Sequence, residues 1–213
     1  MFGWFGGGGG IQLKTFVKAN PPHAGNTPAS AEWASRYNGR LPASLIELWC
    51  THGLGVYGPS ALRLIDPEPW QPILDRWVAL KFPNSQRPWI RIPMALTPFG
   101  DLVFNAKVDD NDGVVFAINA TFSTGRVLGG SADEFFNGFM TKRKERDDFI
   151  EPGWLEDARE RCGELEVHEV YQVDRLLLEM HMLKSIKRDA MQMHHELCDA
   201  LAAKQAAAPE AQT

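Results

Sequence analysis

The sequence has few cysteines, no long apolar run and no excess of positive charge. Its three cysteines are far apart and form no CxxC pair, which argues against a disulfide framework and favours a reducing, cytoplasmic location. No apolar run approaches the ~18 residues of a membrane-spanning helix, and the first residues lack the pattern of a secretory signal peptide. The net charge of -5 argues against sequence-independent binding to nucleic acid, which needs a basic face.

Recognisable catalytic and metal-binding motifs are also scarce. The glycines at 6–10 form a low-complexity run that follows no predicted strand, so we expect a flexible tail and not a nucleotide loop. The acidic turn at 109–113 has the wrong residues at the first and last positions of an EF-hand. His194 and Cys198 have i, i+4 spacing, but zinc needs further ligands nearby. We therefore expect no catalytic residue, no metal and no cofactor, with the histidines of this segment facing solvent.

The first half of the chain carries helical patterns. Residues 42–52 form a predicted helix with a proline in its first turn and a glycine just after its end. A short hairpin and a second amphipathic helix, at about residues 67–77, follow. Four of the seven tryptophans lie at positions suited to a packed core, and we expect Trp49 and Trp77 to be buried.

From residue 89 the apolar period changes from 3.6 to about 2. This change predicts an antiparallel meander with strands at 89–92, 101–107, 114–120 and 126–128. Ser131 and Glu134 form a capping box that opens another helix, and residues 154–162 form one more. A rough heptad over residues 170–204 predicts a long final helix that packs on the domain or pairs two copies.

The predicted fold class is α+β, in which a helical N-terminal unit packs with an antiparallel β-sheet meander, flanking helices and a long C-terminal helix. We expect a flexible Gly-rich tail (1–10), a first unit (11–85) and a second α+β unit (86–170). The long helix (171–205) and a disordered tail (206–213) follow.

Several motifs resemble known families. The motifs of the first unit are Tyr37-Asn38-Gly39-Arg40-Leu41-Pro42, Trp49, His52-Gly53, Tyr57-Gly58, Leu64-Ile65-Asp66-Pro67 and Trp77. Together these motifs resemble the GAD-like domain. Residues 92–95, 97–102 and 131–139 resemble the domain that follows it in type VI secretion DNase-immunity proteins. Residues 171–174 and the charged helix after them depart from that family, so the resemblance does not extend to the C-terminal fifth.

This resemblance implies a bacterial, cytoplasmic immunity protein that binds and neutralises a cognate type VI secretion effector, a DNase toxin, and is not an enzyme. Two alternatives remain open. One is a housekeeping protein-interaction module similar to the SMI1/KNR4 superfamily. The other is an enzyme whose site is assembled from residues scattered along the chain, which a deep pocket with convergent carboxylates or histidines would favour.

Carboxylates are concentrated between residues 145 and 174. We expect part of this stretch, helped by the turn at 109–112, to form an acidic contact face for a basic toxin; a merely solvated helical surface is the alternative. The candidate toxin-binding residues are Asp109, Asp110, Asp112, Asp147, Asp148, Glu151, Glu156, Asp157 and Glu160. The expected partner is the nuclease domain of the effector, with no nucleic acid and no membrane. The chain is expected to be a monomer, or a homodimer through its C-terminal helix.

Overall fold

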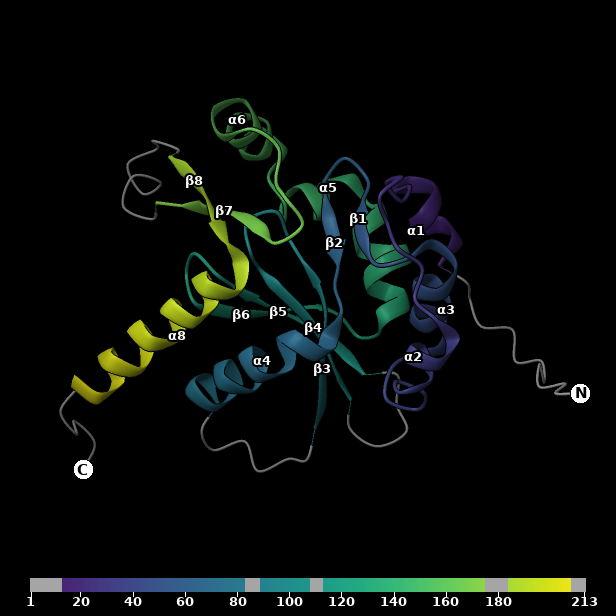
Figure 1. Ribbon diagram of the computed structural model, residues 1–213, viewed down its shortest axis with the longest axis horizontal. Helices are drawn as coiled ribbons and strands as arrows, with labels where there is room; N and C mark the ends of the chain where they lie inside the picture. Colours follow the sequence, from purple (N-terminus) through teal and green to yellow (C-terminus); the bar gives the residue numbers. More distant parts are fainter. Residues whose placement is uncertain (1–12, 83–88, 108–112, 175–183, 208–213) are drawn as a thin grey trace, which may run out of the picture.

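A computed structural model describes residues 13–82, 89–107, 113–174 and 184–207 (Figure 1). Its main feature is a six-stranded antiparallel sheet whose strands follow one another in chain order, and a separate hairpin of two strands lies beside it. The strands are β1 (Gly55–Tyr57), β2 (Leu62–Leu64), β3 (Ile90–Leu96), β4 (Leu102–Lys107), β5 (Val114–Asn119), β6 (Thr124–Gly129), β7 (Glu169–Val173) and β8 (Ser185–Asp189).

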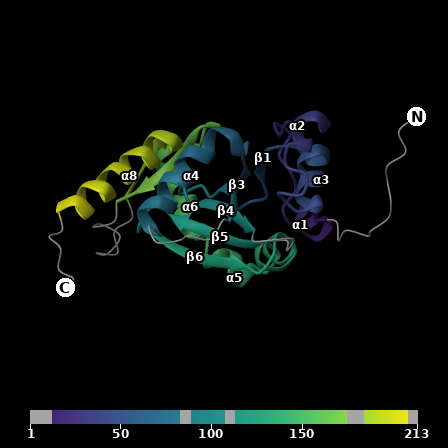
Figure 2. The same ribbon diagram turned by 90° about the horizontal axis from the view of Figure 1, so that it is seen from below.

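Helices cover both faces of the large sheet. Figure 2 shows α4 and α8 on one side of it and α5 on the other. The helices are α1 (Lys14–Ala19), α2 (Ala31–Ser35), α3 (Ala43–His52), α4 (Pro67–Lys81), the π-helix η1 (Glu134–Gly138), the 3-10 helix η2 (Phe139–Thr141), α5 (Arg143–Asp147), α6 (Pro152–Cys162) and α8 (Ala190–Ala207). The predicted α+β class and the meander of β3 to β6 are therefore confirmed. Strands β1 and β2 join the same sheet, so one sheet crosses the predicted unit boundary at residue 85.

The ends of α3 and α4 follow the local signals in the sequence. Helix α3 begins after Pro42 and ends at Gly53, whose φ of 86° is a left-handed conformation that favours glycine. A Cβ at Gly53 would also lie 2.6 Å from the carbonyl carbon of Thr27, so both the turn and the packing need a glycine here. Asp66 caps α4, because its side chain accepts a 3.1 Å hydrogen bond from the backbone N–H of Glu68.

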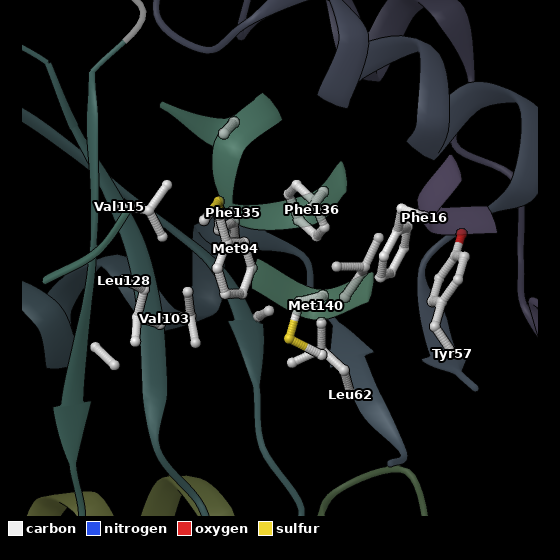
Figure 3. Packing of buried hydrophobic residues seen from close by; sticks show 14 of the residues in the cluster. Phe16, Tyr57, Leu62, Met94, Val103, Val115, Leu128, Phe135, Phe136 and Met140 are labelled. Atoms are coloured by element: carbon white, nitrogen blue, oxygen red, sulfur yellow. The ribbon is translucent and has the colours of Figure 1, made fainter. Parts of the chain in front are cut away.

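Each face of the sheet has its own apolar core. Figure 3 shows the core on the α1 side, where side chains of the sheet meet an aromatic cluster that includes Phe16 and Phe136. The rings of these two residues lie 4.9 Å apart in an edge-to-face arrangement. The opposite core is formed by α4 and α8 against Phe104 and Ile118 of the sheet. Trp49 lies in the first core and Trp77 in the second, both 0% exposed, which confirms their predicted burial.

The prediction of one helix from residue 170 to 204 is wrong in its first half. Residues of β7 pair with β8 in five registered pairs, and the helix begins only at Ala190. The N–H of Tyr171 also donates a 2.8 Å hydrogen bond to the carbonyl of Pro98, which attaches β7 to the turn between β3 and β4. This pairing with distant residues overrides the local heptad pattern. The predicted segment 171–205 is thus a hairpin strand followed by a helix, and residues 175–183 lie outside the described residues.

A buried arginine joins the hairpin to the edge of the large sheet. Arg63 of β2 is 8% exposed, and its guanidinium donates to three backbone carbonyls just before and at the start of β7. Its Nη1 donates to Val167 (2.6 Å) and Glu169 (3.1 Å), and its Nη2 donates to Glu166 (3.2 Å). The planar fork of arginine suits this arrangement, which a lysine ammonium cannot reproduce.

We expect Arg63→Ala to lower the free energy of unfolding by about 2–3 kcal/mol, the range for hydrogen bonds that involve a charged group. Arg36→Ala is the control, because Arg36 forms an exposed ion pair with Glu68 that contributes below ~1 kcal/mol. Urea unfolding of both variants measures the difference. Equal losses would show that the buried contacts of Arg63 do not stabilise the fold.

Candidate functional site

The acidic residues predicted as candidates lie on α5, on α6 and on the connection between them, near one end of the sheet (Figure 1). Asp147 ends α5, Asp148 and Glu151 lie in the connection, and three more residues are on α6, namely Glu156, Asp157 and Glu160. The other three candidates, Asp109, Asp110 and Asp112, lie outside the described residues.

Two of these carboxylates are already paired with arginines of the same segment. Asp147 accepts hydrogen bonds from Arg146 at 3.0 Å and from Arg143 at 3.4 Å. Asp157 accepts from Arg161 at 2.8 Å across one helical turn. Such pairing reduces the negative potential that a partner would meet at these two positions.

The side of α5 and α6 near β1 and β2 is mixed in charge. Here the two helices border a cavity of about 290 Å³. Three arginines line it, Arg143, Arg146 and Arg159, against the two candidate acids Asp147 and Glu156. The acidic stretch in the sequence therefore folds into a surface on which arginines alternate with carboxylates.

Asp148 and Glu151 differ from the arginine-paired Asp147 and Asp157, and they differ from Glu156 and Glu160 in the cavity that they line. Both are exposed, and neither forms an ion pair with any residue that the structure describes. They line a second cavity of about 230 Å³, which we call the acidic cavity. It is bordered by the β3–β4 turn, β5, the β5–β6 turn, β6, the α5–α6 connection and β7, and its lining residues include Phe99, Asp101, Asn119, Phe122, Arg126, Asp148, Phe149, Glu151, Trp154 and Val173.

Asp101 is the buried carboxyl group of this cavity, and it was not among the candidates. It is 3% exposed, and its Oδ1 accepts a 3.0 Å hydrogen bond from the N–H of Ala120. Burial raises the pKa of Asp101 to about 6, although hydrogen bonds from Ala120 and Thr97 and the charge of Arg126 oppose this rise. In the sequence, the only signal for this position is the turn-forming stretch at residues 97–101. In the structure this stretch is a tight turn, in which Gly100 has a φ of 82° and the N–H of Asp101 donates to Oγ1 of Thr97.

Aromatic rings form the walls of the acidic cavity. The rings of Phe99 and Trp154 lie 6.2 Å apart and perpendicular to each other. The guanidinium carbon of Arg126 lies 5.3 Å from the ring centroid of Phe149 and 5.8 Å from that of Phe139, within cation–π range. Phe122, at the tip of the β5–β6 turn, is 39% exposed. The cavity thus combines carboxylates with ring surfaces, one of which already carries a guanidinium.

We expect Asp101→Asn to become more stabilising, relative to the wild type, as the pH rises. The folded-state pKa of about 6 lies above the value of 3.8 for an ordinary aspartate, so charging Asp101 costs stability as the pH rises from about 4 to 6. Asparagine carries no such charge. The stability difference between variant and wild type should therefore shift by roughly 2 kcal/mol in favour of the variant between pH 4 and pH 7. Chemical denaturation at both pH values measures this shift, and a constant difference would contradict it.

A larger cavity of about 440 Å³ adjoins the acidic one, and both are lined by Phe99, Thr121 and Val173. Its remaining apolar lining includes Ile186 of β8, which is half exposed, and Leu197 of α8. The two cavities together extend from α8 to the α5–α6 connection. A partner segment can therefore place an apolar side chain beside a polar one.

The expectation that the histidines of the last helix face solvent is wrong for His194, which is fully buried, while the adjacent His195 is exposed. Nδ1 of His194 accepts a 2.9 Å hydrogen bond from Nε1 of Trp77, and Nε2 lies 2.8 Å from the carbonyl oxygen of Gly100. This arrangement requires a neutral ring protonated at Nε2. Burial lowers the pKa of His194 to about 4, so stability is lost as the pH falls from about 6.5 toward 4.

His194 therefore joins α8 to α4 and to the β3–β4 turn, and it is not placed to bind a metal with Cys198. Burial raises the pKa of the Cys198 thiol to about 11. Within the described ranges, no group of three or more His, Cys, Asp or Glu side chains is arranged to hold a metal ion. The helices in those ranges include none that is long and apolar enough to cross a membrane.

Comparisons with known proteins identify a family and a fold. The model of the GAD-like domain matches residues 12–120. No curated protein matches the sequence. Among solved structures, the crystal structure of Atu4351 from Agrobacterium tumefaciens is similar, with a TM-score of 0.60 and 13% sequence identity over 89% of each chain. At this identity the similarity establishes a shared fold alone.

Proposed function

The chain belongs to the GAD-like domain family, and on that basis we propose that it is an immunity protein that binds and neutralises a cognate type VI secretion effector. The effector is a DNase toxin, and the protein acts in the cytoplasm by binding and not by catalysis. The observation that carries this proposal is the family match over residues 12–120, together with motifs at residues 92–102 and 131–139 that resemble the second domain of DNase-immunity proteins.

The acidic cavity supports this proposal through its charge. A DNA-cleaving domain must present a basic cleft to its substrate, because phosphate contacts dominate DNA binding. A protein that covers such a cleft needs carboxylates that are not already neutralised within its own structure. Asp148 and Glu151 meet that requirement, whereas Asp147 and Asp157 are paired with arginines. Complementary charge of this kind accelerates association and selects the partner.

Inhibition by binding requires a pre-organised surface with a few well-packed anchor positions. The acidic cavity is held by elements that are fixed from several directions. Hydrogen bonds from Ala120 to Asp101 and from Tyr171 to Pro98 connect the β3–β4 turn to β5 and β7. Little conformational entropy is then lost when a partner side chain enters the cavity.

The test is a nuclease assay with purified components. The nuclease domain of the cognate effector is incubated with DNA and increasing amounts of the protein. We expect cleavage to fall to background near a 1:1 ratio, while an unrelated nuclease keeps its activity. Full cleavage at a severalfold excess of the protein would overturn the proposal.

A catalytic mode of protection would give a different result in the same assay. Asp101, Asp148 and Glu151 are three carboxylates on one cavity, which is the arrangement that would favour an enzyme. If Asp101 were a catalytic group, a small fraction of an equivalent of wild-type protein would inactivate the nuclease, and Asp101→Asn would abolish this effect. For inhibition by binding, we expect the wild type to need about one equivalent, and Asp101→Asn to keep this 1:1 stoichiometry while the loss of one cavity carboxylate lowers the affinity.

A further inference from the structure

We propose that the acidic cavity is a binding site for a cationic side chain, an arginine above all, presented by a partner protein. This inference rests on the proposed function, because it names the chemistry by which the partner is recognised at this surface. It concerns the lining formed by Asp101, Asp148 and Glu151 together with the rings of Phe149 and Trp154.

The size of the acidic cavity selects a side chain over a larger ligand. Its volume of about 230 Å³ is below the roughly 300–1,000 Å³ of typical small-molecule pockets. One long side chain fits such a space. The adjoining larger cavity, which shares Phe99, Thr121 and Val173, can receive a neighbouring residue of the same partner segment.

The charge of the lining selects a cation. Asp148 and Glu151 have no ion-pair partner among the described residues, and Asp101 adds a buried carboxyl group. Arg126 is the one cation among the residues that line this cavity, and it leaves an excess of negative charge. An anionic ligand would be repelled, and an apolar ligand would remove water from the carboxylates without replacing their hydrogen bonds.

The rings favour a guanidinium over an ammonium ion. A guanidinium is planar and weakly hydrated. It can stack on an aromatic face while two of its N–H groups donate hydrogen bonds to one carboxylate. The structure already contains this interaction, because Arg126 lies over Phe149 and Phe139 at cation–π distances. Trp154, which is half buried against Phe99, adds the indole ring that gives the strongest cation–π contacts.

The proposal is tested with the protein alone and a defined probe. N-acetyl-arginine amide is titrated into protein labelled with ¹⁵N-tryptophan, and the indole signal of Trp154 is assigned with Trp154→Phe. N-acetyl-citrulline amide is the control probe, because it has nearly the same shape without the charge. We expect saturable shifts with the arginine probe and binding roughly tenfold weaker with the citrulline probe.

Matched variants locate the binding. Asp148→Asn combined with Glu151→Gln should weaken the binding of the arginine probe roughly tenfold. Glu156→Gln combined with Glu160→Gln removes the same charge from α6 outside the acidic cavity, and it should change binding less than about twofold. Equal binding of both probes, or equal effects of the two double variants, would overturn the proposal.

The outcomes separate this inference from the proposed function. If the arginine probe binds in the acidic cavity but the nuclease is not inhibited, the site stands and the immunity function is wrong. If the nuclease is inhibited equally by the wild type and by the Asp148→Asn, Glu151→Gln variant, and the arginine probe does not bind, the function stands and the site is wrong.

Discussion

Replacing Trp77 by alanine is expected to lower the free energy of unfolding by about 3–5 kcal/mol, the range for large aromatic side chains removed from a core. Trp77 is fully buried between α4 and the sheet. The loss should lie near the upper end of that range. Removing the indole also leaves Nδ1 of His194 without its hydrogen-bond donor in a fully buried position.

A comparison of two phenylalanine variants isolates the contribution of that hydrogen bond. Trp49 is also 0% exposed, but its Nε1 has no hydrogen-bond partner within the described part of the chain. Trp49→Phe therefore loses ring volume alone, whereas Trp77→Phe in addition leaves Nδ1 of His194 without a hydrogen-bond partner. We expect Trp77→Phe to cost about 1–3 kcal/mol more in chemical denaturation. An equal cost for both would show that the bond to His194 contributes nothing to stability.

Reversing the charges of Asp148 and Glu151 is expected to slow association with the nuclease domain of the effector by about 10- to 100-fold at low salt. The double variant Asp148→Lys, Glu151→Lys turns the attraction between the acidic cavity and a basic cleft into repulsion. The association rate should then also lose the salt dependence that attraction produces. Stopped-flow or surface-based kinetics at several salt concentrations measures both quantities.

The control for charge reversal carries the same change in net charge on α6. We expect the double variant Glu156→Lys, Glu160→Lys to slow association clearly less, because neither residue lines the acidic cavity. An unchanged melting temperature confirms that both double variants are folded. If the two variants slow association equally, net charge and not the acidic cavity directs the encounter.

The elements that sequence reasoning predicted well are those with local signals. Helices α3 and α4 carry an apolar stripe together with end signals, such as Gly53 after α3 and Asp66 before α4. The strands β3 to β6 follow one another along the chain without a helix between them. In each case the residues that decide the structure lie within a few positions of one another, so a single sequence contains the information.

The C-terminal hairpin and the acidic cavity were not predictable in this way. The hydrogen bond from the N–H of Tyr171 to the carbonyl of Pro98 joins residues far apart in the chain, and no local sequence pattern near residue 171 predicts it. Composition located the acidic stretch, and the structure shows that some of its charge is internally paired, as between Arg143 and Asp147. The approach of Asp101 to Glu151 across one cavity depends on several distant segments, so only the tertiary structure shows it.

The central claim is that the protein binds the effector through the acidic cavity, and hydrogen–deuterium exchange tests it most directly. Exchange is measured for the protein alone and with a saturating amount of the nuclease domain. We expect slower exchange in the complex at residues 148–154 and 119–126, which border the acidic cavity, and unchanged exchange at α3 on the far side of the molecule (Figure 1). Unchanged exchange at the cavity segments in a complex that does form would contradict the claim.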